Sequence, residues 1–244
     1  MSVQFGRWNF DGSAVEQTYL DKVRAIVAPY ATGGSNSYIA NGIGIGYCAF
    51  HTTKESRKES QPHNCPLGVV ITWDGRLDNR ADLVRDLRED VVVGSTDVEI
   101  VGAAYQRWGT AGLARLVGDW ALVIWDLTAG SLILAKDFVG TRPLFYAVDH
   151  RGVTWSTILD PLVLFGGKNV TLCEEYIAGW VSAFPATDLT PYVGIHSVPT
   201  SSYALIRPSG LSVKQYWDFD AGRAIRYRND AQYEEQFRVV FADS

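Results

Sequence analysis

The order of hydrophobic and polar positions predicts strands that come in hairpins and helices that come in separate blocks. Short apolar or alternating runs predict strands, which we place at 2–10, 38–50, 67–73, 116–126, 131–137, 144–148, 152–156, 202–207 and 211–216. Apolar residues at helical spacing predict helices at 15–28, 80–87, 97–108, 160–165, 174–182 and 231–241. A doubly wound parallel sheet needs regular alternation of strand and helix. This order therefore favours an α+β fold, with two packed sheets and helices outside them.

Three glycines alternate within the predicted strand 38–50. Gly42, Gly44 and Gly46 lie two residues apart, which indicates close approach of another backbone or of a ligand. They do not form a phosphate-binding loop, because no helix start follows them.

The predicted strand 67–73 is followed by Asp74-Gly75, a dipeptide typical of a tight turn. The segment 52–66 before this strand is polar, and its charge run at 54–59 mixes acidic and basic residues. We expect a solvated loop there.

Composition narrows the classes of function. Hydrophobic residues make up 47% of the 244 positions, which is enough for a sizeable core. The formal net charge of −5 provides no basic excess for phosphate backbones, so we expect no nucleic-acid partner. No apolar run approaches the roughly 18 residues of a membrane span. No signal peptide is visible either, so we expect a cytoplasmic protein without a membrane partner.

Cysteine and histidine spacing gives no sign of a metal site. Cys48, Cys65 and Cys173 form no CxxC pair, which fits reduced thiols in a cytosolic protein. The four histidines lack the spacing of metal ligands, so we expect no metal.

The C-terminal part breaks the strand and helix pattern. The polar segment 220–230 reads as a linker, and the helix predicted at 231–241 begins shortly before the chain ends. We therefore expect one domain at 1–219, followed at 220–244 by a linker and the truncated start of a second domain.

Several motifs in the first 219 residues are similar to those of one family. The stretch 116–126, Leu-Val-Gly-Asp-Trp-Ala-Leu-Val-Ile-Trp-Asp, resembles a family pattern Gly-x-Phe-Ala-Phe-Ala-Ile-Trp-Asp. The stretch 135–146 resembles Ala-Arg-Asp-x-x-Gly-x-Lys-Pro-Leu-Tyr-Tyr. Further similarity lies at 1–12, 73–83, 96–99, 195–199 and 216–218. Together these motifs resemble the class II glutamine amidotransferase domain of asparagine synthetases, an N-terminal-nucleophile (Ntn) hydrolase family.

The resemblance implies a fold and a partner. The family fold is a four-layer α-β-β-α sandwich with two mainly antiparallel sheets. Asparagine synthetases bind ATP in a second domain through a Ser-Gly-Gly-x-Asp-Ser loop, and this chain contains no such loop. We therefore expect no cofactor in this chain and a synthetase (ATP-binding) domain, absent from it, as partner. A homo-oligomer is an open alternative.

The resemblance places Ser2 where the family has its nucleophilic cysteine. In the family this residue becomes the N-terminus once Met1 is removed, and its own α-amine acts as the base. Some Ntn hydrolases use Ser or Thr, so Ser2 is a candidate nucleophile. An ordinary serine after the initiator methionine is the simpler interpretation. A retained Met1 would leave Ser2 without a free amine.

Other family positions carry different chemistry here. The family oxyanion hole uses an Asn side chain and the next Gly N–H, and Asp74 and Gly75 stand at these positions. An ionised Asp74 is an acceptor only and would repel an oxyanion. Ala49 stands where the family has the Arg that holds the glutamine carboxylate. Arg76 replaces a Glu that holds the α-ammonium.

One of the family's substrate-binding residues is present in this chain. Several other polar residues are explained by structural roles. Asp97 matches the second ammonium-binding residue, although an acidic charge at a helix start explains it equally well. Cys48 lies in the strand that would line the pocket, with no basic residue assignable to activate it. For Asp137 and Arg142 we expect a structural ion pair.

These changes predict a degenerate, non-hydrolytic domain with a structural or interaction role beside an asparagine-synthetase-like domain. Two alternatives stay open. One is an Ntn amidohydrolase that uses Ser2 on a substrate other than glutamine. The other is a variant glutaminase that supplies ammonia for asparagine synthesis.

Overall fold

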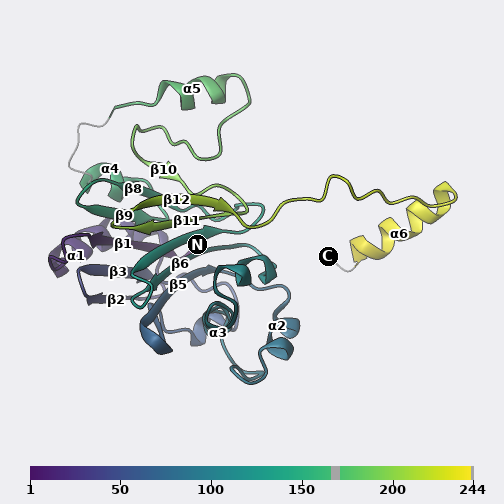
Figure 1. Cartoon of the computed structure of the whole chain (residues 1–244), viewed down its shortest axis with the longest axis horizontal. Coiled ribbons are helices and arrows are strands. Elements are labelled where there is room, and N and C mark those ends of the chain that lie inside the picture. The colour runs from purple at the N-terminus through teal and green to yellow at the C-terminus, as the bar shows by residue number, and fades with distance from the viewer. Residues whose placement is uncertain (166–170, 243–244) are drawn as a thin grey trace.

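Two six-stranded antiparallel sheets lie face to face in the computed structural model, which describes residues 1–165 and 171–242 (Figure 1). The first sheet contains, in spatial order, β10 (His196–Ser197), β8 (Phe145–Val148), β9 (Gly152–Ser156), β1 (Val3–Asn9), β3 (Ile43–Cys48) and β2 (Ser35–Ala40). The second contains β12 (Gly210–Gln215), β11 (Ser202–Arg207), β7 (Ser131–Lys136), β6 (Trp120–Asp126), β5 (Val69–Gly75) and β4 (His63–Cys65). Sequence neighbours pair through hairpins, as the order of predicted elements indicates.

Helices cover both outer faces of this pair of sheets. The first sheet is covered by α1 (Gln17–Val27) and α4 (Asp160–Phe165), and the second by α2 (Arg80–Asp86) and α3 (Asp97–Trp108). The layers therefore run α-β-β-α, as the family resemblance implies. Short 3₁₀ turns lie at Ala28–Tyr30, Ser56–Lys58, Pro66–Gly68 and Gly109–Arg115.

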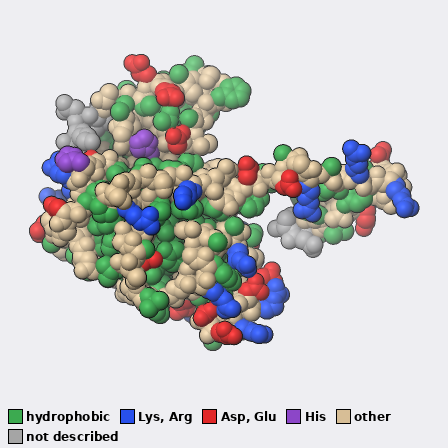
Figure 2. Space-filling view, in the orientation of Figure 1, with side chains coloured by type: hydrophobic (Ala, Val, Ile, Leu, Met, Phe, Trp, Pro, Cys, Tyr) green, Lys and Arg blue, Asp and Glu red, His purple; other side chains and the backbone are tan. Residues whose placement is uncertain are grey.

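Two further helices stand away from the sandwich. They are α5 (Glu174–Val181) and α6 (Asp230–Ala242), and neither buries a residue (Figure 1). Figure 2 shows apolar side chains at the surface of both. Trp180 of α5 and Phe237 of α6 are 60% and 69% exposed. No helix in the described part of the chain is long and apolar enough to cross a membrane.

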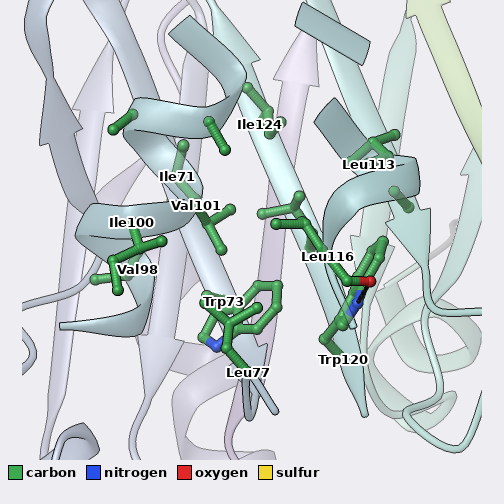
Figure 3. Packing of buried hydrophobic residues seen from close by; sticks show 14 of the residues in the cluster. Ile71, Trp73, Leu77, Val98, Ile100, Val101, Leu113, Leu116, Trp120 and Ile124 are labelled. Carbon is green, nitrogen blue, oxygen red and sulfur yellow. Dashed lines mark hydrogen bonds between the residues drawn. The ribbon is translucent and has the colours of Figure 1, made fainter. Parts of the chain in front are cut away.

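Strand alternation distributes the core over three layers. In β5, Ile71 and Trp73 pack under α3, as Figure 3 shows, whereas Val70 faces the first sheet. In β1, Phe5 packs under α1 and Trp8 faces the second sheet. Each such buried side chain contributes roughly 1.5–3 kcal/mol to stability through removal of apolar surface from water.

The helix α3 begins at Asp97, as predicted, because its first turn satisfies its own backbone. Thr96 and Glu99 form a capping box, in which the Thr96 N–H donates to the Glu99 carboxylate at 2.6 Å. Val98, Ile100 and Val101 then anchor the helix on the second sheet (Figure 3).

The single strand predicted at 38–50 is a hairpin of β2 and β3. It turns at Asn41 and Gly42, whose φ angles are 51° and 73°. The two glycines that follow lie beneath side chains. A Cβ at Gly44 would lie 2.8 Å from Val15, and one at Gly46 would lie 2.2 Å from the Phe5 ring.

The tight turn predicted at Asp74-Gly75 is also wrong. Both residues belong to β5 and pair with Ala121 and Trp120 of β6. The predicted loop 52–66 contains β4, which pairs with β5. The local turn signal is overridden because pairing with β6 extends the ladder through this dipeptide.

Candidate functional site

The start of β1 and the end of β5 meet at one end of the layer between the sheets. Even-numbered residues of both strands face this layer. The Gln4 side chain crosses it and donates to the Ala121 carbonyl at 3.0 Å, while the Thr72 hydroxyl donates to Gln4 Oε1 at 2.7 Å. This fully buried bridge fixes the relative position of the strands, and it places Ser2 beside Asp74.

Ser2 is buried and its polar atoms are engaged by nearby groups. Its backbone N–H donates to Oδ1 of Asp74 at 2.9 Å. Its hydroxyl accepts the Phe50 N–H at 3.0 Å and donates to the Phe50 carbonyl at 3.4 Å. The α-amino group of this structure belongs to Met1, and burial lowers its pKa.

Asp74 is 3% exposed and carries a charge partner that sequence reasoning did not identify. The guanidinium of Arg142 lies 3.6 Å from its Oδ1. Oδ2 has no hydrogen-bond partner among the described residues. Burial raises the pKa of Asp74, while Arg142 and the bond from Ser2 act in the opposite direction.

The predicted ion pair between Asp137 and Arg142 is wrong, because Arg142 pairs with Asp74. The Asp137 carboxylate instead accepts three backbone N–H groups, from Trp120 at 2.8 Å and from Val139 and Gly140 at 2.7 Å each. Asp137 thus shapes the turn that brings Arg142 to the site.

Gly75 and Arg76 follow Asp74 but face different surroundings. A Cβ at Gly75 would lie 2.5 Å from the Cβ of Trp120, so the close packing of β5 on β6 requires glycine. Arg76 is half exposed and forms an ion pair with Asp78 at 2.6 Å, which raises its pKa. The Arg76 cation is thus already paired.

Asp97 lies at the start of α3, which agrees with the helix-charge interpretation. It is 4% exposed, accepts the Leu77 N–H at 3.2 Å and forms an ion pair with Arg80. Burial raises its pKa, and the Leu77 N–H and Arg80 oppose this. Neither partner was predicted from the sequence.

The backbone of Ala49 extends the pairing of β3 by one residue, to the segment just before β2. Its N–H donates to Gly34 O at 2.8 Å, and its carbonyl accepts the Gly33 N–H at 2.7 Å. Its methyl side chain offers no charge for a carboxylate. Cys48, beside it, packs in the cluster under α1, and burial raises the pKa of its thiol, which disfavours a reactive thiolate.

Two residues in the predicted solvated loop prove to belong to this region. Gln61 is 2% exposed, and its amide bonds to both the N–H of Trp73, at 2.6 Å, and its carbonyl, at 3.0 Å. Its Nε2 also donates to Glu59 at 2.8 Å. Burial raises the pKa of Glu59 to about 7, and Asp97 contributes in the same direction. The charge run gave no signal for this acid.

The arrangement couples each buried acid of the site to a local partner. Asp74 is engaged by Ser2 and Arg142, and Asp97 by Leu77 and Arg80. Across the described ranges, no group of three or more His, Cys, Asp or Glu side chains could hold a metal ion.

Fold and motifs define the class of protein. Residues 6–217 match the model of the glutamine amidotransferase domain, and the chain belongs to this family. A more particular likeness is to a putative asparagine synthetase (glutamine-hydrolyzing) of Mycobacterium tuberculosis strain H37Rv. The two are 32% identical over 195 residues, which cover 75% of this chain and 30% of that protein. The amidase chyE of Penicillium rubens is 28% identical over 198 residues, which cover 80% of this chain and 29% of that protein. The predicted relationship to asparagine synthetase N-terminal domains is confirmed.

Solved structures show the same fold. The glutamine phosphoribosylpyrophosphate amidotransferase of B. subtilis superposes with a TM-score of 0.64 at 14% sequence identity, over 88% of this chain and 49% of that one. The expected Ntn-type sandwich is therefore confirmed. The chain spans at most 30% of the length of the curated relatives named above.

Proposed function

We propose that this domain does not hydrolyse glutamine, and that it serves as a structural and interaction domain for an asparagine-synthetase-type ATP-binding domain. The observation that carries the proposal is the hydrogen bond from the Ser2 nitrogen to Asp74 at 2.9 Å. It affects both the base and the oxyanion hole of the family mechanism.

The base is lost in either state of the N-terminus. While Met1 is present, the Ser2 nitrogen is an amide and cannot take a proton. If Met1 is removed, the new α-amine lies in hydrogen-bond contact with the Asp74 carboxylate. A carboxylate at this distance stabilises the ammonium form and so opposes the proton loss that the amine must undergo before it can act as a base.

At the oxyanion-hole position, a carboxylate replaces the family's hydrogen-bond donor. Removal of a single oxyanion donor typically costs about 10²–10³ in rate. An ionised Asp74, paired with Arg142, supplies an acceptor where the family mechanism needs that donor. The nearby cation of Arg142 lies 3.6 Å from Asp74 and is paired with it.

The groups that would hold glutamine are changed as well. Ala49 has no charge for the substrate carboxylate, and Arg76 has the same sign as the substrate ammonium. Asp97 is occupied by Arg80 and Leu77. The changes in glutamine binding and the changes in the base and oxyanion hole support the same conclusion independently.

The interaction role follows from the exposed apolar helices. Trp180, Val181 and Phe184, on and just after α5, are 60%, 85% and 85% exposed, and α6 buries none of its residues. Large exposed apolar side chains in one region indicate a surface that another protein or domain covers. We propose 1–219 as the amidotransferase-type domain and 220–244 as the linker and start of the ATP-binding domain.

Ammonia release from glutamine tests the proposal. The purified chain is compared with Ser2→Ala at enzyme concentrations high enough to detect one turnover per hour. We expect equal release from the two proteins, at the level of spontaneous hydrolysis. Ser2-dependent release from glutamine would overturn the proposal and support the variant glutaminase.

A second set of substrates tests the remaining alternative, an Ntn amidohydrolase that uses Ser2. A panel of other amides is offered to the same two proteins, and intact-mass measurement records whether Met1 is present. Ser2-dependent hydrolysis of another amide by chains that begin at Ser2 would establish the Ntn amidohydrolase instead.

A further inference from the structure

A cavity of about 320 Å³ lies on the outer face of the first sheet, away from Ser2 and Asp74. Strands β1, β8 and β9 form its floor, and α4 and the segment 192–195 form its walls. Its volume is at the lower end of the range of small-molecule sites in proteins. The glutamine amidotransferase chemistry considered above does not use it.

The floor carries one cation and one hydroxyl side by side. Arg7 of β1 pairs in register with Thr154 of β9, which in turn pairs with Ala147 of β8. Three residues in one row across adjacent strands point to the same face of a sheet. All three line the cavity, so a guanidinium and a hydroxyl are neighbours on its floor.

Arg7 is a partly buried cation that no carboxylate pairs with among the described residues. Its Nε donates to the Asn9 side chain at 2.7 Å, and its guanidinium carbon lies 5.9 Å from the centre of the Tyr19 ring. These neutral contacts orient the side chain but leave its charge uncompensated at close range. Asp11 is fully exposed and is influenced by Arg7 only from a distance.

Among the described residues, one acidic side chain lines the cavity. Asp149 accepts the backbone N–H groups of Arg151 at 2.8 Å and Gly152 at 3.1 Å. Its carboxylate has the same sign as an acidic ligand. The apolar side chains of Leu162, Val163, Phe165 and Ile195 also line the cavity, together with the hydroxyl-bearing Thr171 and Tyr192.

From this arrangement we infer a binding site for a small monoanionic carboxylic acid with an apolar body. The carboxylate would lie against Arg7 and Thr154, because a guanidinium forms paired hydrogen bonds with carboxylate oxygens. The apolar body would fill the space between α4 and Ile195. Arg7 and Ser2 lie five residues apart on opposite faces of β1, roughly 16 Å along the strand, so this site is separate from the amidotransferase site.

A charged and a neutral probe of equal shape test the site. Titration calorimetry of the purified chain compares 3-phenylpropanoate with 3-phenylpropanamide. We expect the acid to bind at least about tenfold more tightly, since a hydrogen bond to a charged group is worth that much. Equal affinities, or no binding of the acid at 10 mM, roughly the weak limit of measurable affinity, would overturn the proposal.

Variants locate the binding. Arg7→Gln should reduce the affinity for the acid to that for the amide, and Arg151→Gln, a matched charge change on the exposed turn beside the cavity, should leave it unaltered. Val163→Trp should abolish binding of both probes by filling the cavity, and it keeps the test decisive if Arg7→Gln does not fold. Equal weakening by Arg151→Gln, or full binding to Val163→Trp, would contradict the assignment.

Discussion

The backbone nitrogen of Ser2 and Oδ1 of Asp74, 2.9 Å apart, join two residues that are 72 positions apart in sequence. The bond ties the start of β1 in one sheet to the end of β5 in the other. Arg142 adds a third segment of chain to the same point. The position that the motif resemblance assigns to catalysis is thus a point where three segments of this chain meet, and its effect on stability can be measured separately from any activity.

Removal of the Asp74 carboxylate should destabilise the fold. We expect Asp74→Ala to lower the free energy of unfolding by about 1–3 kcal/mol, because a buried N–H loses its acceptor and Arg142 loses its counter-ion. Asp74→Asn, which keeps an acceptor oxygen, should cost less. Urea denaturation measures both. Asp78→Ala removes an exposed partner of Arg76 and should change stability by less than about 1 kcal/mol. Equal effects of Asp74→Ala and Asp78→Ala would contradict this role of the Asp74 carboxylate.

Glu59 should make stability depend on pH. Its pKa rises from 4.5 in the unfolded chain to about 7 in the fold, because it is buried. The folded state therefore binds the proton more tightly. This contribution is complete below about pH 4.5 and is lost as the pH rises through about 7. Over that window it amounts to about 1–3 kcal/mol.

Glu59→Gln isolates this contribution, because glutamine resembles the protonated acid. Unfolding free energies of the two proteins should agree at pH 5 within about 1 kcal/mol, and the variant should be the more stable at pH 8. A constant difference between them at both pH values would show that Glu59 does not titrate in this range.

Lys136 should act with the opposite sign. It is 6% exposed, donates to the Ser197 hydroxyl at 3.1 Å, and has its pKa lowered by burial from 10.5 to about 8. Between these values the unfolded chain binds the extra proton, so this contribution to stability increases with pH. Lys136→Met should therefore equal or exceed the original chain in stability at pH 7, and its advantage should shrink by about 1–3 kcal/mol towards pH 10. An advantage that grows with pH would contradict the buried ammonium.

Gly46 should tolerate no side chain. An alanine Cβ there would lie 2.2 Å from the fully buried Phe5 ring, so Gly46→Ala should cost about 1–3 kcal/mol through overpacking. Gly94 has no heavy atom within 4 Å of the same position, and Gly94→Ala should change stability by less than about 1 kcal/mol. Thermal unfolding of both variants makes the comparison. A tolerated Gly46→Ala would mean that Phe5 can move.

The sequence predicted those parts of the fold that depend on periodicity. Helix α3 was placed at its observed bounds because a capping box and an apolar stripe lie within one local segment. The error at Asp74-Gly75 has the opposite origin. Asp-Gly favours a turn locally, but pairing with Ala121 and Trp120 extends the strand through it. Local preference cannot report on a neighbouring strand that is 45 residues away in sequence.

The partners in the site were the hardest to predict for the same reason. The family positions Ser2, Asp74 and Asp97 could be named from motifs. Arg142 and Arg80 could not be assigned to them, because ion pairs between distant segments leave no spacing signal. Glu59 was hidden in a charge run that resembles an ordinary surface loop.

Gln61 has a consequence for the outer edge of the second sheet. Strand β4 pairs with β5 only from Val69 to Ile71, so the outward N–H and carbonyl of Trp73 would otherwise be open. The Gln61 side-chain amide binds both and stands in for one peptide unit of a missing strand. An open strand edge is a template for pairing with other chains. One glutamine side chain therefore protects this end of β5 from aggregation.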